Sequence, residues 1–147
     1  MKHVRTQLRD RVVQVLTGLA TTGSRVYSGR SRPLGKEHEP SLLVYATDET
    51  SEVHAMGGVL LNTLTLVVEG RAVAARAEDI EDTLDQIAAE VWPAMVSYPL
   101  LGGLALEVTP VATTISAVSP GENHAGEIRM EFRVVYRVRE SDPTQTV

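Results

Sequence analysis

The segment from Glu127 to Arg139 limits the possible folds more than any other part of the chain. Apolar side chains occupy every second position, and charged side chains fill all but one of the positions between them. A period of two belongs to a β-strand with one face buried and the other in water. Such half-buried strands are typical of antiparallel sheets. We therefore predict a strand over residues 127–139, in a sheet with its hydrophobic core on one face.

Two other segments, residues 3–20 and 77–96, carry a helical pattern. Their apolar residues recur every three or four positions and form one stripe along each segment. Gly23 is placed to stop the first helix, and Pro93 should kink or end the second. The stripes consist of Val4, Leu8, Val12, Val15, Leu16 and Leu19 in the first helix, and of Ile80, Leu84, Ile87, Ala88, Val91 and Met95 in the second.

Four further strands are expected between turns rich in glycine and proline. They cover residues 25–28, 41–46, 59–69 and 104–118, and Pro110 marks the last of them as an edge strand or a bulge. Residues 48–58 form either a hairpin tip or a longer flexible arm. Residues 140–147 are expected to be a flexible C-terminal tail.

These elements predict a single α+β domain over residues 1–139, in the order α-β-β-β-α-β-β. Two amphipathic helices most simply cover the same face of a mainly antiparallel sheet, which gives a two-layer sandwich. The opposite sheet face is then exposed to solvent or covered by another subunit.

Charge is distributed unevenly along the chain. The net charge is −5, yet residues 1–34 carry seven basic groups against one acid, residues 35–126 carry three against fourteen, and residues 127–147 carry four against four. Most of the basic residues are arginine, which suits bidentate pairing with carboxylates across an interface. The basic part of one subunit can therefore meet the acidic part of a neighbour. Alternatively, the two parts pair within one subunit, or the arginines reflect base composition.

The sequence offers little for catalysis. The absence of cysteine excludes disulfides, thiol catalysis and cysteine-based metal sites. The four histidines have no zinc-binding spacing, so we expect no metal, no cofactor and no enzyme activity. The acidic residues near the start of the second helix suit the positive end of its dipole. A site assembled between subunits around Asp82, Asp85 and His54 remains an alternative.

Nucleic-acid and membrane binding are also disfavoured. A net negative charge argues against a protein that coats nucleic acid or an anionic membrane. No apolar stretch approaches the roughly 18 residues that span a bilayer, and the N-terminus is amphipathic, so a soluble cytoplasmic protein is expected. The arginines of the last strand alternate with Glu127 and Glu131, a pattern more typical of cross-strand ion pairs or a subunit interface. A small RNA- or ligand-binding α+β module remains a further alternative.

Several short strings, in order, resemble the tail terminator proteins of long-tailed phages, the family of the lambda minor tail protein U. They span roughly residues 1–139. They are Met1-Lys2-His3 before an amphipathic helix, Pro40-Ser41-Leu42-Leu43-Val44-Tyr45 at the first central strand, Asp85-Gln86-Ile87-Ala88 and Val91-Trp92-Pro93-Ala94-Met95 on the second helix, and Val134-Val135-Tyr136 in the closing strand.

The resemblance implies a two-layer α+β fold and a structural role without catalysis. Such proteins form a ring of six subunits that caps the finished tail tube, stops its polymerisation and offers a surface for joining the head. The implied partners are further copies in a homohexamer, the tail tube protein and the head-tail connector protein, and DNA passes through unread. The implied location is the head-proximal end of the virion tail, after assembly in the host cytoplasm. A head-tail joining or tail completion protein of related fold is the main alternative.

A head-to-tail ring needs two different surfaces on each subunit. We expect the oligomer or tube interface to draw on both charged parts, on the arm and on the last strand. The candidate residues are Arg5, Arg9, Arg30, Arg32, Glu49, Glu52, His54, Met56, Asp82, Asp85, Arg133 and Arg137.

Overall fold

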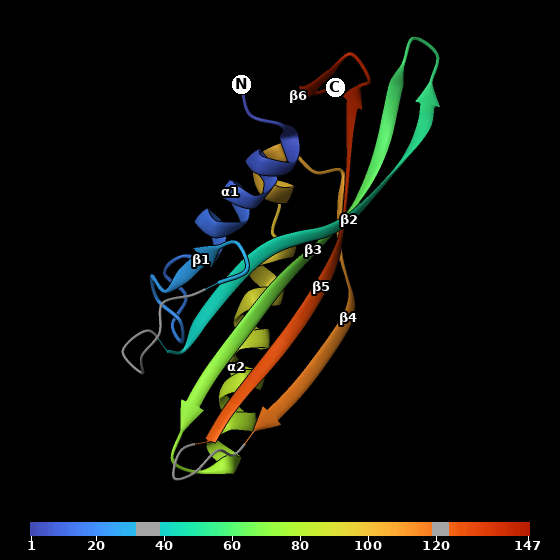
Figure 1. Cartoon of the computed structure of the whole chain (residues 1–147). Coiled ribbons are helices and arrows are strands. Elements are labelled where there is room, and N and C mark those ends of the chain that lie inside the picture. The colour runs from blue at the N-terminus through green and yellow to red at the C-terminus, as the bar shows by residue number, and fades with distance from the viewer. Residues whose placement is uncertain (32–38, 119–123) are drawn as a thin grey trace.

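A long, twisted six-stranded sheet dominates the computed structural model, which describes residues 1–31, 39–118 and 124–147 (Figure 1). In the described residues, two α-helices and a short 3-10 helix accompany the strands. In chain order the elements are α1 (Val4–Leu16), β1 (Val26–Ser28), β2 (Ser41–Ala55), β3 (Val59–Ala74), α2 (Ala77–Val96), η2 (Leu100–Gly103), β4 (Glu107–Val118), β5 (His124–Arg139) and β6 (Asp142–Thr146).

The strand order in the sheet is β1-β2-β3-β5-β4, and β6 pairs with the end of β5. The pairing of β1 with β2 is parallel, and every other pairing is antiparallel. As predicted, Pro110 lies at both an edge and a bulge. Among the described residues β4 pairs with β5 alone, and its register shifts between Pro110 and Ala112. Pro110 thus lies where a missing N–H costs least.

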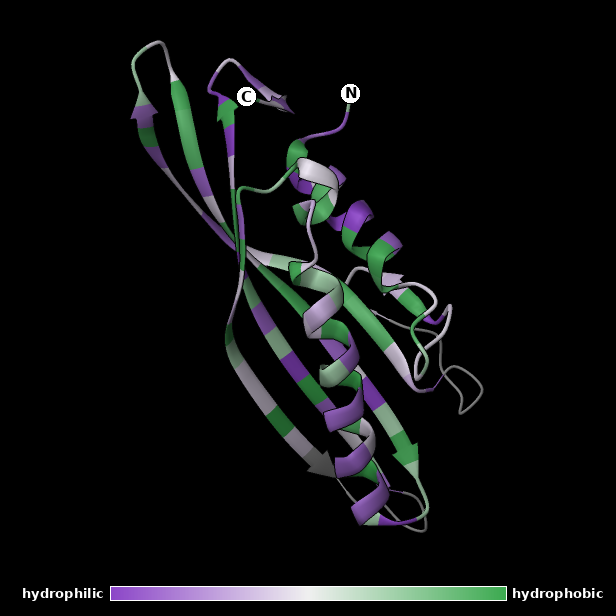
Figure 2. Ribbon diagram, turned by 180° about the vertical axis from the view of Figure 1, so that it is seen from behind, coloured by the Kyte–Doolittle hydropathy of each residue, from purple (hydrophilic) through white to green (hydrophobic). Residues whose placement is uncertain are grey.

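Both helices pack against the same sheet face (Figure 2). Most of each predicted stripe is buried. In the first stripe, Val4, Leu8, Val12 and Leu16 have no solvent exposure, whereas Val15 and Leu19, like Ala88 of α2, are partly buried against the core. The alternation of β5 also holds, since Ile128, Met130, Phe132, Val134, Tyr136 and Val138 are all buried in the main core. The two-layer α+β fold expected from the sequence is confirmed.

Two glycines in the sheet bring α2 close to β3 and β5. A Cβ atom at Gly126 would lie 2.4 Å from Cγ2 of Ile80, and one at Gly70 would lie 2.9 Å from Cγ2 of Ile87. Each isoleucine therefore occupies the space that a side chain on the strand would fill. As a result, α2 packs directly over the two central strands of the sheet.

The first helix is shorter than predicted. It ends at Leu16, not at residue 20, and the chain then turns through Gly23, whose φ of +56° favours glycine. Glu90 of α2 fixes this turn by accepting hydrogen bonds from the backbone N–H of Thr21 at 2.9 Å and from its hydroxyl at 2.6 Å. Burial alone would raise the pKa of Glu90, but the hydrogen bonds from Thr21 and Gln86 lower it below its usual range.

The second helix has the predicted limits. It passes through Pro93 and ends at Val96, so the proline does not end it at once. Pro93 is exposed, on the side of the helix away from the core.

Of the two alternatives for residues 48–58, the structure shows the hairpin. Two other predictions need correction. The strand expected over residues 41–46 continues to Ala55, so the hairpin is long and has a short turn at its tip. The segment expected to be a flexible tail, residues 140–147, instead contains β6. At the start of β6, Asp142 accepts hydrogen bonds from the backbone N–H and hydroxyl of Thr144, and these bonds lower the pKa of Asp142.

The sheet face opposite the helices is not uniformly open. Leu43, Tyr45 and Val67 are buried there in a second small cluster, against which Tyr27 packs. From the sequence, this face is expected to be exposed to solvent or covered by another subunit. Part of it is instead covered by side chains of the same chain.

Replacing Gly126 with alanine should destabilise the fold by about 1–3 kcal/mol, because the new methyl group overlaps Ile80 and Leu84 in a close-packed core. The measurement is the midpoint of urea unfolding. The control is Ser116→Ala on the neighbouring strand, where the side chain is exposed and little change is expected. An unchanged midpoint for Gly126→Ala would contradict this account of how α2 packs.

Candidate assembly surfaces

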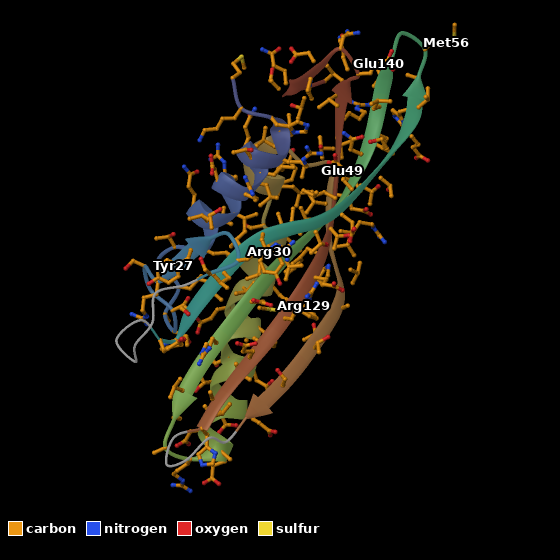
Figure 3. The ribbon with its side chains drawn as sticks, in the orientation of Figure 1. Tyr27, Arg30, Glu49, Met56, Arg129 and Glu140 are labelled. Carbon is orange, nitrogen blue, oxygen red and sulfur yellow. The ribbon has the colours of Figure 1, made fainter. Side chains whose placement is uncertain are left out.

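The first candidate surface is the arm, which we define as the part of the β2–β3 hairpin from Asp48 to Asn62. The arm extends past both helices (Figure 1). At its tip the side chain of Met56 is 98% exposed, and nearby Val53 is 77% exposed. The tip is not free of the body, because the backbone N–H of Glu140 donates to the carbonyl of Gly58 at 2.7 Å. Figure 3 shows Met56 and Glu140 together at this end of the molecule.

A polar network fixes the base of the arm. Nη1 of Arg5 in α1 lies 2.5 Å from Oε2 of Glu49 in β2. The hydroxyl of Tyr136 in β5 donates to the other oxygen of the same carboxylate. The side chain of Glu49 is only 13% exposed, so both partners compensate for the loss of water around its charge. Burial, and then the hydrogen bond to Glu49, raise the pKa of Tyr136 far above its usual value.

A cavity of about 390 Å³ lies beside this network, between the start of α1 and β2. Arg9 lines it, as do His3, Thr6 and Thr47. The Nε atom of Arg9 is buried without a hydrogen-bond partner, and its Nη2 atom reaches only the Thr6 hydroxyl, at 3.5 Å. Arg9 thus has donor capacity that the described part of the chain does not use.

Three of the four arginines of β5 form ion pairs or hydrogen bonds within the chain. Nε of Arg133 lies 3.1 Å from Oε2 of Glu107, and Nη2 of Arg129 lies 3.1 Å from Oε1 of Glu131. Nε of Arg137 donates to the carbonyl of Val147 at 3.2 Å. Arg133 thus forms an ion pair with the neighbouring strand. Cross-strand pairing is one of the two roles that the sequence suggested for the arginines of the last long strand.

Two further predicted residues of the basic N-terminal part fall in different places. Arg30 lies over the ring of Tyr45, with its guanidinium carbon 4.4 Å from the ring centre, and it donates to the carbonyl of Ala46. Figure 3 shows Arg30 on the sheet face opposite the helices. Arg32 lies outside the described residues.

The remaining predicted residues are separated widely within one chain. Asp82 and Asp85 are exposed on α2, and no ion pair to either occurs in residues 1–31, 39–118 and 124–147. Glu52 and His54 are exposed on the arm. The arm and the start of α2 lie at opposite ends of the molecule (Figure 1). Of the predicted residues, the structure therefore brings Arg5 and Glu49 into contact, but not His54 with the α2 acids.

A second candidate surface was missed in the sequence. It is the groove between α2 and β4, which contains cavities of about 260 Å³ beside Trp92 and Val111 and about 360 Å³ beside Asp85 and Ile115. Trp92 is 43% exposed. The sequence does show apolar residues in β4. Alternation alone does not show that α2 packs mainly over β3 and β5 and covers the edge strand only in part.

Within residues 1–31, 39–118 and 124–147, no group of three or more histidine, aspartate or glutamate side chains is placed to hold a metal ion. Among the same residues, no helix is long and apolar enough to cross a membrane.

Comparison with known proteins gives distant likenesses among solved structures. No protein-family model and no curated protein matches the chain. A chain in the solved structure described as "Virion of native gene transfer agent (GTA) particle" is 20% identical, with a TM-score of 0.49, and the match covers 90% of this chain and 92% of that one. A likeness of this degree assigns neither a family nor a role to the chain.

Replacing Tyr136 with phenylalanine should lower the free energy of unfolding by about 1 kcal/mol at neutral pH, because Glu49 loses a buried hydrogen bond. The raised pKa also predicts a pH effect. The folded wild type holds the phenol proton more tightly than the unfolded chain, so its stability should fall as the pH rises above about 10.

Equilibrium unfolding between pH 7 and 11 measures both effects, and Tyr136→Phe should lose less stability over the alkaline part of this range. The control is Tyr98→Phe, which changes a phenol that is 91% exposed. Equal losses of stability in wild type and Tyr136→Phe would contradict the link between Tyr136 and Glu49.

Proposed function

We propose that this protein is a structural component of a phage virion that forms a ring on the end of the tail tube. The ring ends tube polymerisation and provides the surface to which the head attaches. The observation that carries the proposal is the ordered set of strings that resemble the tail terminator family, from Met1 to Tyr136. The two-layer α+β fold that this resemblance implies is the fold of the chain.

The shape of the chain supports an assembly role. The arm leaves apolar side chains such as Met56 and Val53 in water, and the groove beside Trp92 leaves others. Exposed apolar groups that gather at particular places are typical of protein interfaces. Since the arm and the groove are different surfaces, they suit the head-to-tail contacts that close a ring.

The charge distribution also supports an assembly role, but fewer charged side chains are available for it than the sequence suggested. Arg5 and Glu49 form an ion pair within the chain, so part of their charge is already compensated there. Arg11, which is exposed, and Arg9 form no ion pair with the described residues, and neither do Asp82 and Asp85. We therefore assign the electrostatic part of the subunit interface to these side chains.

The remaining features of the proposal concern the partners. The ring is a homohexamer, with the number six implied by the resemblance, and it contacts the tail tube protein on one side and a head-tail connector protein on the other. DNA passes through it without specific binding, which suits a chain with a net charge of −5. The protein is then located at the head-proximal end of the tail.

The purified protein should form a ring and cap tail tubes. Native mass spectrometry is expected to give six subunits, and addition of the protein to growing tubes should stop their elongation, with the protein at one end in electron micrographs. A monomer at every concentration, with tube protein also present, would overturn the proposal. Binding to the connector without binding to tubes would instead support a head-tail joining protein.

Neutralising the α2 acids should weaken the ring. The double variant Asp82→Asn, Asp85→Asn removes two charges that form no ion pair with the described residues, so the concentration for half-assembly should rise by about tenfold, and added salt should weaken the wild-type ring in the same direction. Analytical ultracentrifugation at several salt concentrations measures both effects. Asp10→Asn, which affects an exposed pair with Lys2, is the control. Assembly that responds to neither change would indicate an apolar interface.

A further inference from the structure

The sheet has an open edge at β4. In the described part of the chain β4 pairs with β5 alone, so the backbone groups on its other side have no partner strand. The side chains from Val111 to Ser116 are all exposed, and residues 108–118 include no charged residue. Natural proteins usually protect a long edge strand with charges, because its unpaired N–H and C=O groups otherwise bind other strands. The edge of β4 beyond the bulge at Pro110 has no such charges.

A second open edge lies on the other side of the same sheet, along the arm. Strand β1 pairs with β2 only between residues 42 and 44, and Arg30 satisfies the carbonyl of Ala46. From Asp48 to Ala55, β2 pairs with β3 on one side, and no described strand lies on its other side. This open stretch has the same length as the stretch of β4 from Val111 to Val118.

Side chains on the two edges are compatible in a continuous sheet. The register places Val53 opposite Leu60 of β3, which packs against the core that the helices cover. The groove lined by Trp92 and Val111 lies on that helix-covered side as well, between β4 and α2. When two sheets join edge to edge with the same face towards the helices, the exposed Val53 of one chain faces the partly empty groove of the next.

We propose that β2 of the arm from one copy adds to the open edge of β4 of the next copy, so that the sheets of neighbouring subunits become continuous around the ring. The occupant of the groove beside β4 is thus a second copy of this chain. This inference rests on the proposed function, because it names the surfaces through which the ring closes.

Two other pairings are conceivable, arm with arm and β4 with β4. The first is disfavoured by charge, and the second does not build a ring. Two arms side by side would bring together the exposed Asp48 and Glu52 of each copy, which repel one another. Two β4 edges can pair about a two-fold axis, but this contact closes a dimer and leaves both arms open. Pairing of arm with β4 leaves no long edge unpaired in a closed ring.

Cross-linking tests the contact directly, because the chain contains no native cysteine. Thr50→Cys on the arm and Thr114→Cys on β4 are exposed positions on the face opposite the helices, according to the register with Thr63 and Arg129. A short bis-maleimide reagent should convert the double variant into a ladder of covalent oligomers on a denaturing gel. The matched control combines Thr50→Cys with Gln14→Cys, an exposed position on α1, and should give no ladder.

Introducing a charge on β4 gives a second test. It does not require two side chains to lie within reach of a cross-linking reagent. Thr114→Glu should raise the concentration for half-assembly by about tenfold, because the new carboxylate would face the acidic arm of the next copy. Thr114→Gln, of equal size, should assemble as wild type does. The new carboxylate lies opposite Arg129 within its own chain, so folding should be unaffected.

Each outcome decides between specific arrangements. A ladder from the double variant, together with the effect of Thr114→Glu, supports the proposal. Covalent dimers from Thr114→Cys alone indicate pairing of two β4 edges and overturn it. A ring that forms in native mass spectrometry but gives no ladder also overturns it while leaving the proposed function intact, whereas the absence of any ring defeats the proposed function itself.

Discussion

The close approach of α2 to the two central strands determines much of the structure. Gly70 and Gly126 leave space for Ile87 and Ile80, so the helix lies directly on β3 and β5. Leu84, Val91 and Met95 are buried in the same core. A helix centred on these two strands contacts the edge strand β4 less than it contacts them. The exposed edge of β4 and the groove beside Trp92 therefore follow from the same packing that stabilises the core.

The elements with strict periodicity were predictable from the sequence. The burial of alternate residues in β5 and the limits of α2 follow from patterns that a helix or strand imposes over many residues. The ends of elements were less predictable. The first helix stops at Leu16 because the chain turns back there, and Thr21 then pairs with Glu90 from a helix far along the sequence. No local pattern could reveal a hydrogen bond between residues so far apart.

The arm and the C-terminal strand show another limit of sequence patterns. The residues from Asp48 to His54 are mostly polar, and a polar stretch is expected to be a loop when it is considered alone. It is a strand because β3 continues beside it, and β3 in turn pairs with β5 as far as Arg139. The strand β6 likewise depends on the end of β5. In each case the partner strand, not the segment itself, supplies the structure.

The same dependence makes the arm suitable for assembly. Glu49 links it through Tyr136 to the central strand and through Arg5 to α1, and Glu140 holds its tip. An arm that is already extended and fixed in direction loses less conformational entropy on binding than a flexible loop. Its acidic residues Asp48 and Glu52 remain exposed, and they disfavour contact with a second arm. The arm is fixed in direction and repels a second arm, whereas the open stretch of β4 on the opposite edge carries no charge, so the two surfaces are complementary. A ring closes when one such contact is repeated in a fixed direction.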